Sequence, residues 1–351
     1  MLSIVSMGEH TSALAAGLAR EAGILAHQHP AWCGVFQAMN ADCRGLVAMR
    51  DGLVAGWVIY SVFEGPLGTV VNSMPLIAYG GPAVPDSDPE VEEYLLKALR
   101  AEAERLDADV LTVSTSPFLT VEQVDLYRAT LRVTHELENF VQLQHLDTHP
   151  LDQLSSRSRA ALQRHLKTAL RNGLRISPEL SSERFEEWLT IYRNRFAEIG
   201  ATPYPDEFYR QVYRKAVPLG IAEFWSVFDG EVLVGGTMFL NSGTSVDYFS
   251  PVFRSDYRHL APNTYLLNEA FEEFRRRGVR CFNWQSSPGR SGVYVYKARW
   301  GAYESRHFYL SVLLHSESRL LKVPVTQVRE DYPLRFVLPH SAWQSTAAEL
   351  R

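Results

Sequence analysis

LVAMRDGLVAGWVIYS, residues 46–61, and FWSVFDGEVLVGGTMFL, residues 224–240, each place an Asp-Gly pair between two apolar runs. An Asp-Gly pair between such runs is a strong signal for a β-hairpin, and the first copy is typical of a type I′ turn. Asp51 and Asp229 are 178 residues apart. The chain therefore contains the same hairpin pattern twice.

A second pair of matching segments follows the two hairpins. Two predicted helices begin with the sequence YLL, at residues 94–96 and 265–267, and each leads into a short apolar run. These runs end at Ser-Pro, at residues 116–117 and 287–288, so that both ends of the segment repeat after 171 residues. A hairpin, a helix and a buried strand repeated at this spacing predict two related α/β (α+β) domains in tandem.

The length of the chain agrees with two domains. It has 351 residues, and a domain usually contains roughly 100–200. A polar junction with His149-Pro150 precedes a change to a basic helix at residues 155–172. We expect a first domain at residues 1–148 and a second at 149–315. A C-terminal segment, 316–351, is expected to pack back on the first domain.

Composition and local motifs exclude several classes of protein. A net charge of −5 argues against a protein that coats nucleic acid but leaves room for a local basic patch. The three cysteines form no CxxC pair, and the sequence contains no GxSxG, Walker, HExxH or GxGxxG motif. His27 and His29 have no third ligand beside them, so no metal site is expected. Because the N-terminus lacks a signal-peptide pattern and no apolar run reaches the ~20 residues of a membrane span, we expect a cytoplasmic protein. We also expect a monomer.

The order hairpin, strand, loop, helix, strand resembles the core of the GNAT acyltransferase fold. In that family the loop before the helix has the pattern Gln/Arg-x-x-Gly-x-Gly/Ala, and its bare amides hold the pyrophosphate of coenzyme A at the helix N-terminus. The matching segment here, YRHLAPN at residues 257–263, has no glycine, and Pro262 lacks an amide donor. The usual coenzyme A site is therefore degraded in the second domain.

Further motifs resemble the FemAB/FemX family, whose members are tandem GNAT-fold transferases that add amino acids to peptidoglycan precursors from aminoacyl-tRNA. The matching pieces extend over residues 25 to 312, and their order and spacing match as well as their residues. They are His29-Pro30, the loop at 75–82, the end of the basic helix at 171–173, Val246-Asp247-Tyr248, Ala261-Pro262-Asn263 and YKARWGA at 296–302.

The resemblance implies a catalytic group. Lys297 matches the family's lysine near the transfer centre, where an ammonium stabilises the oxyanion that forms as an amine attacks an ester or thioester. Tyr248 and Tyr296 are candidates to orient the acceptor or to relay a proton. Asp247 is the candidate carboxylate for holding or deprotonating the attacking ammonium. Because side chains alternate along a strand, only one of Asp247 and Tyr248 is expected to face the site.

The remaining candidates are substrate contacts. Arg210 and Tyr213 match a pair that grips the acceptor's diphosphate in the family, although the spacing here is one residue shorter. The other candidates for acceptor contacts are Tyr79, Asn283, Gln285, Ser286 and Arg290. Candidates for donor contacts are Arg258 and Asn263 beside the degraded loop and Arg164, Lys167 and Arg171 on the basic helix. The charges of that helix also fit an ordinary solvated helix face.

Three functions stay open at this point. The leading one forms an amide bond by moving an aminoacyl group from a charged tRNA to an amine acceptor, such as a peptidoglycan precursor or another peptide metabolite. The degraded loop and the basic helix favour tRNA as donor, with no permanently bound cofactor. Acyl-CoA is the alternative donor. A catalytically inactive tandem-GNAT binding module is the third reading, and retention of Lys297 argues against it.

Overall fold

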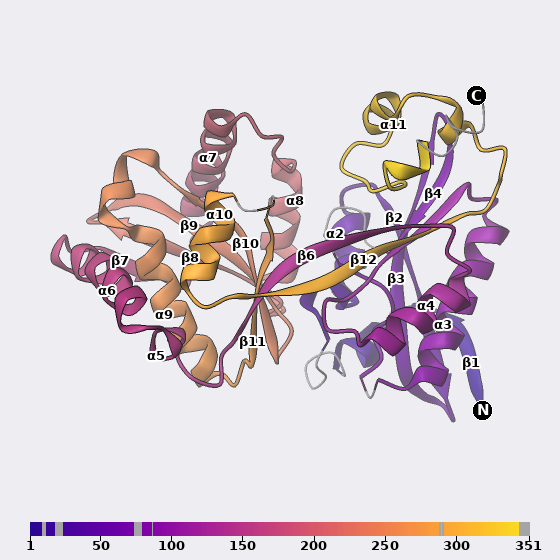
Figure 1. Cartoon of the computed structure of the whole chain (residues 1–351), viewed down its shortest axis with the longest axis horizontal. Coiled ribbons are helices and arrows are strands. Elements are labelled where there is room, and N and C mark those ends of the chain that lie inside the picture. Colours follow the sequence, from indigo (N-terminus) through magenta and orange to yellow (C-terminus); the bar gives the residue numbers. More distant parts are fainter. Residues whose placement is uncertain are drawn as a thin grey trace. The chain divides into compact units, whose positions relative to one another are not determined.

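The computed structural model describes residues 1–8, 12–17, 24–73, 79–85, 87–287, 289 and 291–343. The chain divides into two compact units (Figure 1). The first unit combines Met1–Phe140 with Ser305–Arg351, and the second is Val141–Glu304. The division at Phe140 and Glu304 falls within or next to long strands, whereas the sequence pattern placed the junctions near residues 148 and 315.

The first unit contains a mixed sheet whose strands lie in the order β1-β2-β3-β4-β5-β12. All neighbouring strands are antiparallel except β4 and β5, which are parallel. The strands are β1 (Leu2–Ser6), β2 (Asp42–Arg50), β3 (Leu53–Gly65), β4 (Gly68–Asn72), β5 (Val110–Ser114) and β12 (Tyr303–Leu313). The helical elements are η1 (Ala26–Gln28), α2 (Ala31–Gln37), α3 (Pro89–Arg105), α4 (Val121–Leu131), η4 (Arg319–Lys322) and α11 (Val325–Asp331).

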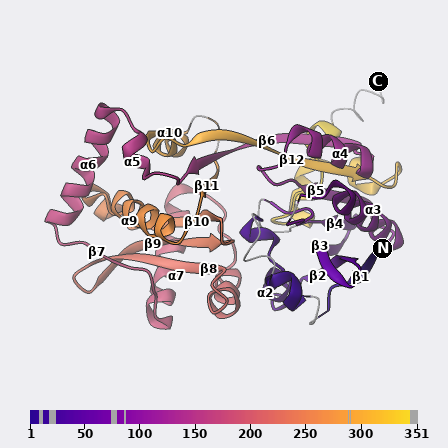
Figure 2. The same ribbon diagram turned by 90° about the horizontal axis from the view of Figure 1, so that it is seen from below.

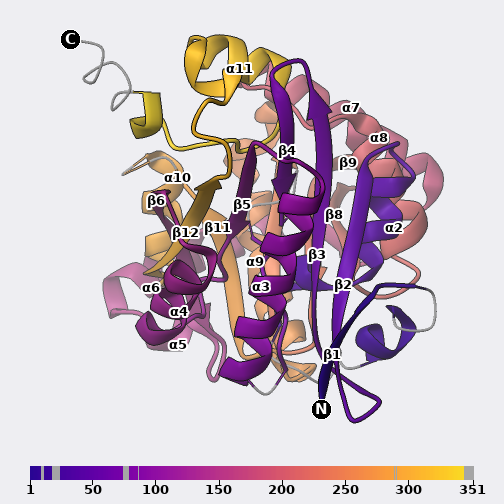
Figure 3. The same ribbon diagram turned by 90° about the vertical axis from the view of Figure 1, so that its right-hand side faces the viewer.

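The two largest of the described apolar clusters on the sheet of the first unit involve α3 and the C-terminal residues. Helix α3 begins after Asp88, whose side chain accepts hydrogen bonds from the amides of residues 90 and 91, and packs on β2, β3 and β5 through its leucines (Figure 3). The C-terminal residues form the other cluster, in which Val328 and Tyr332 pack with Leu67 and Val70. The Tyr332 hydroxyl donates to the carbonyl of Gly68 at 2.8 Å.

The second unit repeats this arrangement. Its strands lie in the order β6-β11-β10-β9-β8-β7, and only β10 and β11 are parallel. The strands are β6 (His135–His145), which crosses the division between the units, β7 (Arg175–Ser177), β8 (Ala222–Asp229), β9 (Val232–Asn241), β10 (Ser245–Phe253) and β11 (Cys281–Ser286). The helical elements are α5 (Pro150–Gln153), α6 (Ser156–Arg171), α7 (Ser182–Ile199), α8 (Asp206–Gln211), η2 (Val212–Ala216), η3 (Ser255–Leu260), α9 (Pro262–Arg276) and α10 (Gly292–Arg299).

The two hairpins differ at their turns. Asp51 and Gly52 both have positive φ, 51° and 83°, as a type I′ turn requires. In the second hairpin Asp229 is still paired with Val232, so the turn residues are Gly230 and Glu231. The sequence signal located both hairpins, and the second turn lies one residue later than the first relative to its Asp-Gly pair.

Helices cover both faces of the second sheet (Figure 2). Strand alternation sends neighbouring side chains of β8 to opposite faces: Trp225 packs against Phe274 of α9, whereas Phe224 packs against Trp188 of α7. Helix α6 packs on α9, with Leu162 and the alanine at 169 buried in the same cluster. The second unit thus has buried apolar residues on both faces of its sheet, under α9 on one side and under α7 on the other.

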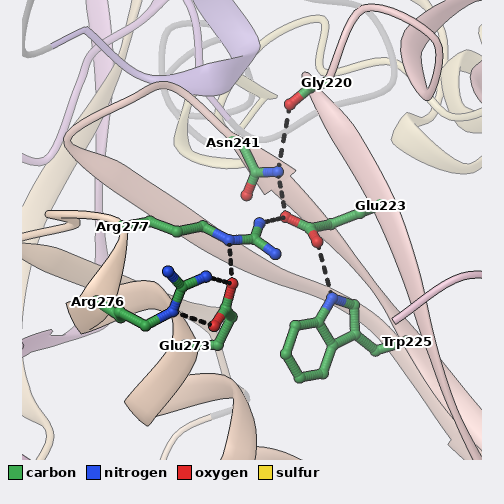
Figure 4. Close-up of polar contacts among 7 residues, drawn as sticks. All are labelled: Gly220, Glu223, Trp225, Asn241, Glu273, Arg276 and Arg277. Atoms are coloured by element: carbon green, nitrogen blue, oxygen red, sulfur yellow. Dashed lines mark hydrogen bonds and ion pairs between the residues drawn. The ribbon is translucent and has the colours of Figure 1, made fainter. Parts of the chain in front are cut away.

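A polar network fixes the C-terminal end of α9 to the sheet (Figure 4). The Glu223 carboxylate accepts hydrogen bonds from Trp225 Nε1 at 2.8 Å, from Asn241 Nδ2 at 2.5 Å and from Arg277 Nη1 at 2.8 Å. Arg277 also donates to Glu273 at 2.8 Å. Glu223 retains only 15% of its side-chain exposure, so this carboxylate lies largely out of water.

The described residues add three further facts. The cysteines are free thiols, and Sγ of Cys43 lies 3.4 Å from Sγ of Cys33. Within the described ranges, no group of three His, Cys, Asp or Glu side chains is placed to hold a metal ion. None of the described helices has both the length and the apolar character that a membrane span needs.

Candidate active site

The second unit contains a pocket of about 540 Å³ between the end of β10, the start of α9 and α10. This volume lies in the range of small-molecule sites. Its lining residues are His165, Arg195, Tyr248, Pro251, Phe253, Arg258, Ala261, Pro262, Asn263, Thr264, Gly292, Val293, Tyr296 and Lys297.

The pocket opens where the two parallel strands of the unit separate. Strands β10 and β11 pair only from Ser245 with Cys281 to Asp247 with Asn283. Beyond this point β10 contains a bulge between Phe249 and Val252. Such a bulge bends its strand and disrupts pairing locally. The separated strand ends leave room for side chains and a ligand beside α9.

The start of α9 supplies unpaired backbone donors to this pocket. Ala261 precedes the helix in a left-handed conformation, with φ of 55°, and no side chain caps the helix. Pro262 has no N–H, so the first available amides are those of Asn263 and Thr264, which both line the pocket. A helix N-terminus favours an anion. Arg258 adds a cationic group to the lining, and Arg195 adds another that also pairs with Glu198 at 2.8 Å, so the pocket suits a negatively charged ligand.

Lys297 enters the pocket from α10, which begins after Ser291, a residue whose hydroxyl accepts a hydrogen bond from the amide of residue 294. Its Nζ donates to the carbonyl of Gln285 at 3.0 Å and to that of Ser286 at 3.1 Å. The residue is 4% exposed, and this burial lowers the pKa of its ammonium to about 7. Both protonation states are therefore accessible near neutral pH.

Two tyrosines join the lysine in the lining of the pocket. The Tyr248 hydroxyl donates to Asn263 Oδ1 at 2.6 Å. The Tyr296 hydroxyl lies 3.3 Å from Thr264 Oγ1. Burial raises the pKa of both phenols, so both remain neutral hydroxyls at physiological pH. They can orient a substrate by donating or accepting a hydrogen bond, as the sequence reading expects of them.

Asp247 lies on the other face of β10 from Tyr248 and does not line the pocket. Its side chain is fully buried and accepts a hydrogen bond from Gln285 Nε2 at 2.9 Å. Asn283 is also fully buried, and its Oδ1 accepts a hydrogen bond from the backbone N–H of Gln285 at 2.9 Å. Ser286 contributes its carbonyl to Lys297. Arg290 lies outside the described residues.

The residues expected to grip a diphosphate are engaged elsewhere in the second unit. Arg210 forms a two-point ion pair with Glu186, at 2.9 and 2.8 Å, which raises its pKa further. The Tyr213 hydroxyl donates to the carbonyl of Leu180 at 2.7 Å. Neither residue lines the pocket. Their assignment to an acceptor stays a prediction that requires breaking these contacts.

Tyr79 belongs to the first unit, where it is buried. Its ring stacks edge-on against His27 at 5.2 Å and against His307 at 5.0 Å. Burial lowers the pKa of His307 to about 4, so this imidazole is neutral at physiological pH. Residues 75–78 of the loop before Tyr79 lie outside the described residues, and a substrate role for Tyr79 stays a prediction.

Four basic residues of α6 share one exposed face. Arg164, Lys167 and Arg171 follow each other at spacings of three and four, and Arg157 lies two turns before Arg164. All four are exposed, and none forms an ion pair within the described part of the chain. His165 of the same helix lines the pocket. The basic face therefore begins beside the pocket.

Several pocket residues carry no clear signal in the sequence. Arg195 occupies one position of a long amphipathic helix, and Thr264 one position of a helix start. Pro251 is the exception, because a proline inside an otherwise apolar strand is typical of a bulge. The other lining residues absent from the sequence-based set are His165, Phe253, Ala261, Pro262, Gly292 and Val293.

Comparisons with known proteins agree with this architecture. The family model described as an acetyltransferase (GNAT) domain matches residues 156–298. No curated protein matches the chain in sequence. Among solved structures, FemX has a TM-score of 0.69 at 13% identity and covers 87% of this chain and 97% of its own.

Two further structures have lower scores. L-PGS from Bacillus licheniformis has a TM-score of 0.59 at 14% identity, covering 94% of this chain and 98% of its own. A tandem GNAT protein from the clavulanic acid biosynthesis pathway has a TM-score of 0.52 at 13% identity, covering 89% and 98%. At these identities the structural likeness establishes the fold alone, and the family match concerns residues 156–298. The chain therefore shares its fold with FemX and a tandem GNAT protein, and residues 156–298 of its second unit match a GNAT acetyltransferase domain.

Proposed function

We propose that this protein forms an amide bond by transferring an aminoacyl group from aminoacyl-tRNA to an amine acceptor, such as a peptidoglycan precursor or another peptide metabolite. The observation that carries the proposal is the pocket that joins Lys297 to the start of α9 and to His165 of α6, the residue next to Arg164 of the basic face. A volume of about 540 Å³ fits the reacting end of a donor, while the body of a tRNA has to lie outside it.

In this reaction the acceptor amine attacks the carbonyl carbon of the aminoacyl ester. The new C–N bond forms while the carbonyl π electrons move to oxygen, and the oxyanion collapses with cleavage of the C–O bond to the ribose. The proton lost by the amine goes to the departing ribose oxygen. Lys297 in its ammonium form donates to the oxyanion, and Tyr248 and Tyr296 orient the reacting groups.

The basic face of α6 supports tRNA as the donor. Arg157, Arg164, Lys167 and Arg171 carry four exposed charges with no carboxylate partner in the described residues. Such charges bind the phosphates of a nucleic acid backbone by releasing counterions. Pro262 also removes one of the amides that would bind a pyrophosphate at α9.

Acyl-CoA is the second candidate donor. The match of residues 156–298 to a GNAT acetyltransferase domain favours it, as do the two remaining amides at the start of α9. The chemistry at Lys297 is the same for a thioester, except that the C–S bond breaks and the proton goes to the departing thiolate. The two donors differ in what binds them, and binding experiments therefore separate them.

The first test compares binding of the two donors. Thermal melting is measured with acyl-CoA thioesters, because a ligand at 100 times its Kd adds about 2.7 kcal/mol to stability. Binding of charged tRNA is measured by fluorescence anisotropy from 50 to 200 mM salt. We expect tRNA binding and no thioester shift. A thioester shift without tRNA binding would transfer the proposal to acyl-CoA.

A triple variant localises tRNA binding. Arg164, Lys167 and Arg171 replaced together by Ala should flatten the slope of log K against log salt by about 2 to 3, since each lost phosphate contact contributes roughly 0.7–0.9. The matched control removes three exposed charges outside α6, at Lys215, Arg319 and Arg329. Equal slopes for both triple variants would place the tRNA on another surface.

A further inference from the structure

Lys297 is held by contacts that begin outside the pocket. Its Nζ lies 3.0 Å from the Gln285 carbonyl oxygen and 3.1 Å from that of Ser286. The side chain of Gln285 donates from Nε2 to Asp247 Oδ1 at 2.9 Å. Gln285 therefore contacts the pocket lysine through its carbonyl and a buried carboxylate through its side chain.

The backbone of Gln285 explains how two successive carbonyls reach one amine. In a regular strand successive carbonyls point in opposite directions, so residues 285 and 286 would not both accept from Nζ. Gln285 has φ of 65°, and the pairing of β11 with β6 shifts register between Asn283 and Ser286. This left-handed bulge breaks the alternation and brings both carbonyls onto Lys297.

The left-handed conformation needs support, because a residue with a Cβ pays roughly 1–2 kcal/mol there. Two fully buried side chains supply it. Asp247 accepts a hydrogen bond from the side-chain carboxamide of Gln285, and Asn283 Oδ1 accepts one from the backbone N–H of Gln285 at 2.9 Å. Asp247 and Asn283 are paired neighbours on β10 and β11. Neither lines the pocket, so neither contacts a ligand bound there.

We propose that Asp247 and Gln285 are positioning residues that aim Lys297 into the pocket: Asp247 fixes the side chain of Gln285, and the bulge at Gln285 presents two carbonyls to Nζ. The catalytic meaning of this device rests on the proposed function. The device itself is a property of the folded chain and is testable without substrate. We propose this positioning role for Asp247 in place of the predicted role in deprotonating the attacking ammonium.

The composition of the chain makes Lys297 easy to observe. The sequence has only five lysines, and the other four, Lys97, Lys167, Lys215 and Lys322, are exposed. NMR of protein labelled with ¹³Cε-lysine therefore gives five signals, and the one lost in Lys297→Met belongs to Lys297. In the wild type this signal should titrate with a midpoint of about 7.

Four variants test the positioning. Asp247→Ala removes the acceptor, and Gln285→Gly keeps the left-handed backbone but removes the carboxamide. Both should free Lys297 toward water and raise its midpoint by about one unit or more. Asp247→Asn keeps an accepting oxygen and should keep the midpoint near 7. The control Cys281→Ser alters a neighbour of Asp247 on β11 that does not contact Lys297, and it should leave the signal unchanged.

The proposal is overturned if Lys297 titrates with the wild-type midpoint in folded Asp247→Ala or Gln285→Gly. If these two variants fail to fold, Gln285→Asn decides, since Asn tolerates the left-handed region but its amide is one methylene too short to reach Asp247. An unchanged Lys297 signal in Gln285→Asn would then refute the role of the side chain.

Kinetics separate this proposal from the proposed function. Once a donor is identified, Asp247→Ala and Gln285→Gly should lower kcat about 10-fold or more with little change in KM, because positioning acts on the reacting geometry. Asp247→Asn should lower kcat less than about threefold by the same reasoning, whereas a proton acceptor at this position would lose roughly 100-fold or more. Lys297→Met could retain full activity while Asp247→Ala and Gln285→Gly still raise the midpoint of the Lys297 signal. That result would support the positioning and refute the catalytic role of Lys297.

Discussion

Replacement of Lys297 by Met should make the stability of the protein respond differently to pH. In the folded state burial lowers the pKa of Lys297 from its ordinary 10.5 to about 7. The unfolded chain therefore binds more protons than the folded chain between about pH 7 and 10.5, and wild-type stability rises with pH in this window. Methionine does not titrate in either state, so its variant lacks this contribution.

The size of the effect follows from the two pKa values. Each unit of pKa difference corresponds to about 1.4 kcal/mol, so the charged lysine costs the fold about 5 kcal/mol below pH 7. At pH 9 the same relation gives a remaining cost of about 2 kcal/mol in the free energy of unfolding of the wild type. The stability of Lys297→Met relative to wild type should thus fall by about 2 kcal/mol between pH 7 and pH 9. The two carbonyls that lose their donor in the variant shift the difference by a constant amount.

Urea unfolding of both proteins at pH 7, 8 and 9 measures this difference. The control is Lys167→Met on the exposed face of α6, for which the difference from wild type should stay flat over the same range. A difference for Lys297→Met that changes by less than about 0.5 kcal/mol would show that the folded lysine has an ordinary pKa. That result would refute the burial argument and, with it, a Lys297 that titrates near pH 7.

Three further predictions concern the second unit. Glu223→Ala should cost roughly 2 kcal/mol in urea unfolding, because it removes the acceptor of the Trp225 indole N–H and one of the acceptors of Asn241 and Arg277. Gly236→Ala should cost about 2 kcal/mol or more, since its Cβ would lie 2.3 Å from the carbonyl oxygen of Trp225. In steady-state assays kcat should fall as pH rises through about 7, the pKa of Lys297, because only its ammonium form can donate to the oxyanion.

The repeated core of the fold could be predicted because local signals determine it. An Asp-Gly pair between apolar runs marks a hairpin, and the YLL helices carry apolar residues on one face. Both units then join the strand after the hairpin, β4 or β10, to a parallel strand across a helix. Three residues pair in each unit: Val70 to Asn72 with Val110 to Thr112, and Ser245 to Asp247 with Cys281 to Asn283.

The partner of each outer strand could not be predicted. Periodicity indicates that residues 303–313 form a strand but not where the strand pairs. In the structure β12 pairs with β5 of the first unit, while the second half of β6 pairs with β11 of the second unit. Each unit thus receives an outer strand that follows the other unit's core in sequence. Pairing with β5 from Tyr309 to Leu313 and the burial of Leu310 and Val312 among residues of the first unit fix the position of β12.

The candidate site was predicted in part, and the reasons differ from residue to residue. Lys297, Tyr248, Tyr296, Arg258 and Asn263 line one pocket, although their roles stay predictions. Their motifs are local, so the sequence alone could bring them to attention. The contact between Asp247 and Gln285 depends on strand alternation together with the bulge at Gln285. This bulge could not be predicted, because no sequence pattern indicates that a residue other than glycine adopts the left-handed conformation.

The way Lys297 is held fits the chemistry that we propose for it. No carboxylate lines the pocket among the described residues. A carboxylate beside Nζ would raise the pKa of the lysine but would also neutralise its charge in an ion pair. Two carbonyl oxygens instead take two of the three N–H groups of the ammonium and leave its net charge in place. The third N–H is then available to an oxyanion, and the dry surroundings that lower the pKa also strengthen that contact. The cost is that only part of the lysine is charged at neutral pH, which is the expected balance for a group that must stabilise negative charge without a permanent partner.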